Sequence, residues 1–154
     1  MVRVSRGFPL ARKRTHVRKT IAFDGTAGNG ATGGVTVFTL TGRVLVEALT
    51  IFCTETLEEA APTATVALGT ATGTGNIISA TSATTIAAND WWIDATPGEV
   101  GYANLVQTLS SGPSQKDFAL SESLLITVAT QDVTNGTLVI DAWYRPITDN
   151  GSLV

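Results

Sequence analysis

The segment that decides the fold class covers residues 124–144, LLITVATQDVTNGTLVIDAWY. Apolar side chains recur at every second residue on either side of its centre: Leu124, Ile126 and Val128 before it, and Leu138, Ile140, Ala142 and Tyr144 after it. A two-residue period places such side chains on one face of a β-strand. Between the two runs, Asn135-Gly136 is the dipeptide most typical of a tight hairpin turn. The segment therefore predicts an antiparallel hairpin with its turn at residues 134–137.

The chain beyond residue 19 extends this β pattern. Thr, Val and Ile are frequent there, and branching at Cβ favours the pleated conformation of a strand. Strands are predicted near residues 20–24, 35–41, 43–54, 64–69, 75–80, 84–88, 90–94, 103–109, 123–131 and 137–145. In the third of them the apolar positions change from even to odd residue numbers near Ala48. This change of parity predicts a β-bulge or a strand that crosses from one sheet to another.

Helix signals are weak throughout the chain. Only Glu55–Ala61 carries a cluster of helix-forming residues, which supports a single turn at most, and Pro62 closes it. Short strands with a turn signal about every 8–12 residues are typical of a β-sandwich or a jelly roll. We therefore expect an all-β fold, an antiparallel β-sandwich that is jelly-roll-like, over residues 20–154. An extended N-terminal arm is expected at residues 1–19.

Charge is distributed unevenly along the chain. The net charge is −3, yet seven of the ten basic residues precede the first acidic residue, Asp24. These seven are Arg3, Arg6, Arg12, Lys13, Arg14, Arg18 and Lys19. A run of like charges repels itself and stays extended until a partner neutralises it. We expect the arm to dock on an acidic protein surface, including that of another copy, in preference to remaining a solvated tail. Nucleic acid is disfavoured as a partner, because the acidic remainder of the chain would repel it.

The sequence offers little catalytic chemistry. One Cys and one His exclude an internal disulfide and an ordinary zinc site. His16 lies in the basic arm, where neighbouring positive charge opposes a general base, and Cys53 falls on the apolar parity of its strand, as a buried small hydrophobe would. The glycine-rich segment 28–33 matches G-x-G-x-x-G, but an alternating strand follows it where a dinucleotide site requires a helix. We expect no enzyme, no cofactor and no metal site.

The sequence predicts neither a membrane-spanning helix nor a secretion signal. No apolar run approaches the ~20 residues of a membrane-spanning helix. The basic N-terminus is not followed by the apolar stretch of a secretion signal. Neither a membrane partner nor secretion is predicted.

Two adjacent tryptophans form a second candidate site. Asp90 and Asp94 flank Trp91 and Trp92, and on an alternating strand Asp90, Trp92 and Asp94 would share one face. These residues and Tyr102 are candidates for an anchor in the core or at an interface, or for contact with a ligand such as a sugar. Catalysis by the two carboxylates is the least favoured of these roles.

Several segments occur in an order that resembles a known family. TGRVLV at residues 41–46, ALGT at 67–70, DWWIDATP at 90–97 and GTLVIDAWYRP at 136–146 follow one another. This order, over roughly residues 35–150, resembles the small β-rich virion proteins of tailed bacteriophages, in particular the jelly-roll-like head decoration (cement) proteins.

The resemblance implies a non-enzymatic subunit that forms homo-oligomers, with trimers favoured, and links neighbouring capsomers on an assembled shell. Its partners would be the major capsid protein or another virion protein, and it would reach the virion by assembly in the host cytoplasm. A free cysteine suits assembly in a reducing compartment. The same type of domain occurs in head fibres and tail-associated proteins. The alternative is therefore a carbohydrate-binding β-sandwich of that kind, with Trp91 or Trp92 and Tyr102 against the sugar.

Overall fold

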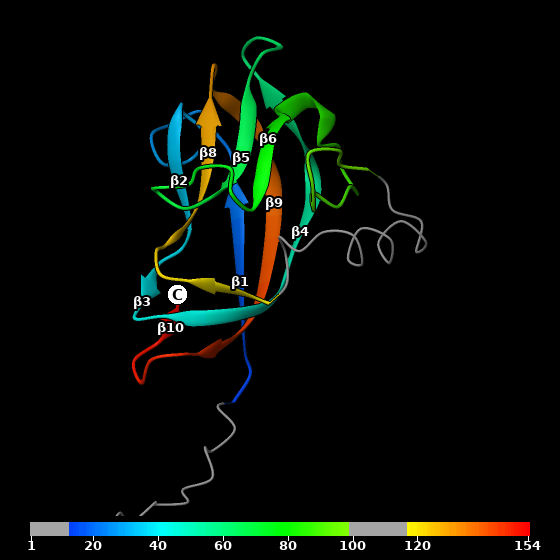
Figure 1. The fold of residues 1–154 in the computed structure, drawn as a ribbon. Helices are drawn as coiled ribbons and strands as arrows, with labels where there is room; N and C mark the ends of the chain where they lie inside the picture. The colour runs from blue at the N-terminus through cyan, green and yellow to red at the C-terminus, as the bar shows by residue number, and fades with distance from the viewer. Residues whose placement is uncertain (1–12, 99–116) are drawn as a thin grey trace, which may run out of the picture.

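The computed structural model describes residues 13–98 and 117–154 and is shown in Figure 1. Its strands are β1 (Thr15–Ala22), β2 (Gly33–Phe38), β3 (Leu40–Thr41), β4 (Val44–Glu59), β5 (Thr65–Gly69), β6 (Ile78–Ser82), β7 (Phe118–Leu120), β8 (Leu124–Ala129), β9 (Val133–Pro146) and β10 (Ser152–Leu153). A short 3-10 helix, η1 (Ala83–Thr85), is the one helical element of the described residues.

Eight of these strands form two four-stranded antiparallel sheets. One sheet has the order β1-β9-β4-β7 and the other β2-β8-β5-β6, while β3 and β10 pair separately. Figure 1 shows the second sheet in front of the first. Counted in chain order, the eight strands run 1-8-3-6 in one sheet and 2-7-4-5 in the other, which is the strand order of a jelly roll. The predicted all-β sandwich is confirmed.

The core lies between the two sheets and takes alternate residues from each strand. In β4 the buried residues have even numbers up to Val46 and odd numbers from Leu49 to Cys53. The register against β9 shifts between Val46 and Ala48, so Glu47 is the extra residue of a β-bulge. The parity change predicted near Ala48 is therefore a bulge, and it keeps the apolar side chains pointing inward on both sides.

The hairpin predicted at Asn135-Gly136 is wrong. β8 pairs with β2 and β5, whereas β9 pairs with β1 and β4, so the chain crosses from one sheet to the other at residues 130–132. Gly136 lies inside β9 with a φ of +114°. A Cβ at this position would lie only 2.7 Å from the Cα of Leu57 in β4. Glycine is needed here for positive φ and for the close approach of two strands, not for a turn.

The boundary between arm and domain also needs correction. β1 begins at Thr15 and pairs with β9 from Thr15 opposite Tyr144 to Ala22 opposite Thr137. Residues 15–19, which the sequence analysis assigned to the arm, are therefore part of the sheet. His16 and Arg18 lie on the face away from the core, whereas Val17 and Ile21 lie on the core side. Lys19 shares the parity of Val17 and Ile21 but is exposed.

Other segments differ from the predicted elements. β4 continues as a strand to Glu59, paired with Val133 of β9, so the weak helical signal at Glu55–Ala61 is overridden by the sheet. Residues 84–88 contain the end of η1 and no strand. The strand predicted at residues 103–109 lies outside the described residues.

Gly136→Ala tests the close approach of β9 to β4. The new methyl group would overlap Leu57 at an unfavourable positive φ, so we expect the free energy of unfolding to fall by more than about 1 kcal/mol. Gly34→Ala in β2 is the matched control, because an added Cβ there meets nothing closer than 3.9 Å. Urea denaturation followed by circular dichroism measures both variants, and equal effects would contradict the assignment.

Candidate functional site

The face of the β1–β9–β4 sheet that points away from the core carries a network of charged and aromatic side chains. In β9, Asp141, Trp143 and Arg145 occupy alternate positions between residues that point into the core. The register places His16 directly opposite Trp143 and Arg18 directly opposite Asp141. Opposed residues on one sheet face have Cβ atoms about 5 Å apart, so the side chains of the two strands meet. We call this surface the outer face.

Asp141 binds two side chains of β1. Arg18 donates from Nε and Nη2 to the two carboxylate oxygens, at 2.9 and 3.0 Å, and Nε2 of His16 lies 2.5 Å from Oδ1. The Asp141 side chain is only 12% exposed. Burial raises the pKa of this carboxyl, but the hydrogen bonds and positive charge of Arg18 and His16 outweigh burial, so the pKa lies below its usual value.

Glu47, at the β4 bulge, binds two arginines. Its Oε1 lies 2.5 Å from Nε of Arg145, and its Oε2 lies 3.1 Å from Nε of Arg14, just before β1. The carboxylate side chain is 14% exposed, whereas those of Arg145 and Arg14 are 51% and 55% exposed. The negative charge therefore lies beneath the positive charges, and this end of the sheet presents guanidinium groups to solvent.

Trp143 lies between these two ion-pair groups. The ring of His16 stacks on it with centroids 4.9 Å apart and an interplanar angle of 28°. The guanidinium carbon of Arg14 lies 5.9 Å from the ring centroid, within the range of a cation–π interaction. Stacking and charge thus join three strands across the outer face, in addition to the backbone hydrogen bonds of the sheet.

The predicted arm residues fall into two groups. Three of the seven lie outside the described residues: Arg3, Arg6 and Arg12. Of the other four, Lys13 and Lys19 are exposed, while Arg14 and Arg18 bind carboxylates of their own chain. Arg14 and Arg18, predicted as arm residues that bind a partner, are instead paired within the chain, Arg18 from β1 and Arg14 from the residue just before it.

The segment around the paired tryptophans is irregular rather than a strand, so the predicted face shared by Asp90, Trp92 and Asp94 does not form. Asp90 is buried, and its Oδ2 accepts a hydrogen bond from the backbone N–H of Ala87 at 2.9 Å. Oδ1 of Asp94 accepts hydrogen bonds from the backbone N–H and the hydroxyl of Thr96, both at 2.7 Å. The two carboxylates each stabilise a separate turn.

The two tryptophans have different environments. Trp92 is fully buried, and its Nε1 donates a hydrogen bond to Oγ1 of Thr81 at 3.0 Å. Trp91 is half-buried, and its ring packs against Phe52 with centroids 4.9 Å apart. Trp92 is therefore an anchor of the core and is not accessible to a sugar. Tyr102, which completed the predicted sugar contact, lies outside the described residues.

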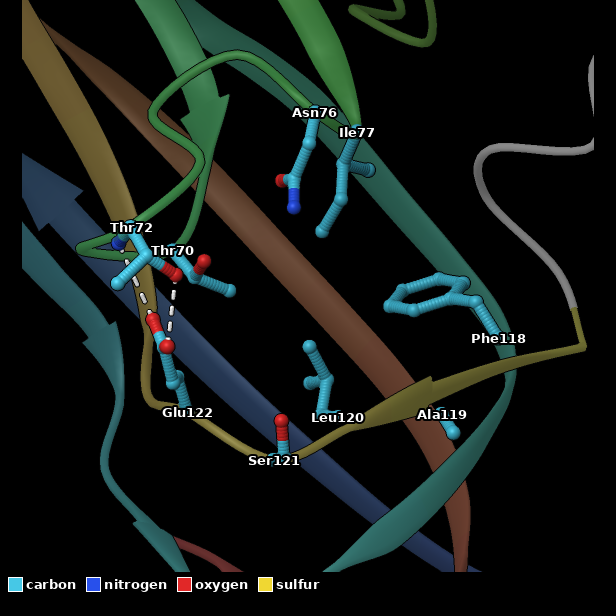
Figure 2. A pocket seen from close by; sticks show the side chains of 9 residues that line it. All are labelled: Thr70, Thr72, Asn76, Ile77, Phe118, Ala119, Leu120, Ser121 and Glu122. Atoms are coloured by element: carbon cyan, nitrogen blue, oxygen red, sulfur yellow. Dashed lines mark hydrogen bonds between the residues drawn. The ribbon is translucent and has the colours of Figure 1, made fainter.

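A hollow of about 450 Å³ opens between the β5–β6 connection and β7, as Figure 2 shows. Its lining combines apolar and polar side chains: Thr70, Thr72, Asn76, Ile77, Phe118, Ala119, Leu120, Ser121 and Glu122. Thr72 donates to Glu122 from its hydroxyl at 2.7 Å and from its backbone N–H at 3.1 Å. These bonds hold the pKa of Glu122 below its usual value. Glu122 thus holds the β5–β6 connection in place through its bonds to Thr72. None of the other residues that line this hollow is an aspartate or a glutamate.

Residues 28–32 of the glycine-rich segment lie in the connection between β1 and β2, and Gly33 begins β2; Thr26 bridges to Asn29 and Gly30. A strand follows it, so the interpretation as an inter-strand loop is confirmed. Within residues 13–98 and 117–154, no group of three or more His, Cys, Asp or Glu side chains is placed to hold a metal ion. Over the same residues, no helix has the length and apolar character to span a bilayer.

Comparisons with known proteins identify a shared fold. No family model matches this chain, and no curated protein matches it. Among solved structures, a chain of the capsid asymmetric unit of cyanophage Pam1 is similar, with a TM-score of 0.55 and 19% sequence identity. The likeness covers 90% of this chain and 89% of that chain. The common fold therefore extends over nearly the whole of both chains.

Asp141→Asn tests the charge network of the outer face. Because the pKa of Asp141 is depressed in the folded state, its contribution to stability is full above the unfolded pKa of about 3.9 and is lost as pH falls through the lower folded value. We expect the unfolding free energy of the wild type to fall more steeply below about pH 4 than that of the variant. Denaturant titrations at several pH values measure this, with the exposed Asp117→Asn as control. Parallel profiles for wild type and Asp141→Asn would count against the network.

Cys53 is fully buried, and burial raises the pKa of its thiol to about 11. Since the thiolate is the reactive form, we expect no labelling by a thiol reagent at neutral pH in the folded protein and complete labelling in denaturant. Rapid labelling of the folded protein would contradict the burial of this side chain.

Proposed function

We propose that this chain is a non-enzymatic structural protein of a phage virion, a capsid decoration or cement subunit. It forms homo-oligomers, with a trimer favoured, and links neighbouring capsomers. The observation that carries the proposal is the shared fold with a chain of the cyanophage Pam1 capsid asymmetric unit, over 90% of this chain. The partners proposed are the major capsid protein or another virion protein, reached by assembly in the host cytoplasm.

The roles of the polar side chains support a structural rather than a chemical function. Glu47 and Asp141 bind arginines of the same sheet, Asp90 stabilises a turn, and Cys53 is buried. These four side chains are therefore engaged in holding the fold. A rigid block of this kind suits a protein that reinforces an assembly.

The N-terminal residues supply the proposed contact with the shell. Residues 1–12 carry Arg3, Arg6 and Arg12 and no acidic residue, and in the sequence they precede Arg14, which is exposed at one end of the sheet. We assign to this shortened arm the docking on an acidic surface of an adjacent subunit or of the shell. One exposed ion pair contributes less than ~1 kcal/mol, but pairs repeated on tethered copies add through effective concentration.

Deleting residues 1–12 tests the arm. The deletion leaves β1 whole, whereas deletion to residue 19 would remove five of its residues. We expect the shortened protein to fold and melt like the intact one, but to cosediment more weakly with purified shells that lack this protein. Binding of the intact protein should fall as salt rises, because exposed charge pairs are screened.

The matched variant replaces Arg3, Arg6 and Arg12 with Ser at full length, and it should bind as weakly as the deletion if charge is the cause. Salt-insensitive binding that is equal for all three proteins would remove the arm from the mechanism.

A further inference from the structure

Charge is distributed unevenly along the β1–β9–β4 sheet, although Glu47, Asp141 and Asp149 lie among the basic residues. All Lys and Arg residues of the described part of the chain lie on or beside β1, or where β9 ends and β4 begins: Lys13, Arg14, Arg18, Lys19, Arg43 and Arg145. Five carboxylates gather where β4 and β1 end and β9 begins: Asp24, Glu55, Glu58, Glu59 and Asp132. These are the lower and upper ends of the sheet in Figure 1. At about 3.3 Å per residue, they are roughly 40 Å apart along β9.

The cationic end, which we define by Arg14, Arg43 and Arg145, carries three arginines, with Glu47 between two of them and Asp149 in the loop that bonds to the backbone of Arg43. Arg14 and Arg145 share the single carboxylate of Glu47. Arg43 is exposed, and its hydrogen bonds in the described structure are made by its backbone. Its carbonyl accepts from the N–H groups of Ile147 and Thr148, and its N–H donates to Oγ1 of Thr148. Its guanidinium is therefore available to a partner. Ile147 is 46% exposed beside it, so the surface offers an apolar contact as well as charge.

The acidic end, which we define by Glu55, Glu58 and Glu59, contains a matching hollow. The hollow has a volume of about 440 Å³, and Glu58, Glu59, Ala60 and Pro62 are among its lining residues. Oε2 of Glu59 accepts a hydrogen bond from the backbone N–H of Ala64, while its buried Oε1 has no donor among the described residues. Glu58, which also lines the hollow, is exposed, so its carboxylate can accept a hydrogen bond from a cationic donor of a partner.

We propose that copies of this chain associate head to tail, with the cationic end of one copy against the hollow of the acidic end of the next. The inference deepens the proposed function and rests on its homo-oligomer. A two-fold contact between like ends would oppose charges of the same sign. Because the complementary surfaces lie at opposite ends of one sheet, each copy binds two neighbours, and such a heterologous contact closes into a ring where the rotation allows. The occupant of the hollow is therefore a second copy of this chain.

Charge reversal tests this contact in the isolated protein. Arg43→Glu and Glu58→Arg each place like charges across the interface, so each should weaken self-association at least tenfold. In the double variant a glutamate at position 43 of one copy faces an arginine at position 58 of the next. Opposite charges are therefore restored, and most of the association should be recovered. Sedimentation velocity at about 0.05 and 0.5 M salt measures the oligomer, and higher salt should weaken the wild-type contact.

Two controls keep the outcome interpretable. Lys19→Glu makes the same charge change as Arg43→Glu in the middle of β1 and should leave association unchanged. Arg43→Gln and Glu58→Gln replace the reversals if either fails to fold, and each should weaken association by a smaller factor. A wild type that stays monomeric, single reversals without effect, or a double variant no better than the singles would overturn the head-to-tail contact. Shells are absent from this experiment, so its failure is separate from failure of the arm to bind them.

Discussion

The long pairing of β4 with β9 is the constraint on which the rest of the structure depends. The two strands stay in contact from Val44 opposite Pro146 to Glu59 opposite Val133. The bulge at Glu47 shifts the register of β4 by one residue. The apolar residues change from even to odd numbers at the same place, so they point into the core on both sides of the bulge. At the other end of the ladder, the absence of a side chain at Gly136 lets β9 approach Leu57 of β4, so the pairing continues to Glu59. The same ladder thus supplies one wall of the core and holds the two charged ends apart.

The outer face explains how a segment rich in positive charge becomes a strand. Asp141 and Glu47 lie almost buried beneath the arginines that bind them, and Trp143 fills the space between. An edge strand with charged side chains also resists pairing with the edge of another sheet. The charge that remains exposed therefore lies at the two ends of the sheet, where we propose that neighbouring copies bind.

Sequence patterns predicted which side chains of a strand point into the core better than they predicted which strands pair with each other. The parity change near Ala48 and the burial of Cys53 follow from residue periodicity, and both are present in the structure. The hairpin at Asn135-Gly136 was wrong because alternation does not say which sheet a strand joins. Val17 and Ile21 share the inward parity of β1, but Lys19 occupies the same parity between them and concealed the alternation. The ion pairs of Glu47 and Asp141 span more than thirty residues of sequence, so no local pattern indicated them.

The central claim is that the chain is a component of a virion and reinforces its shell. Quantitative mass spectrometry of phage particles purified from cells that produce this chain measures this directly. Incorporation on the shell predicts a copy number within about an order of magnitude of that of the major capsid protein, retained after density-gradient purification. A chain found in the infected-cell lysate and missing from the purified particles would contradict the claim.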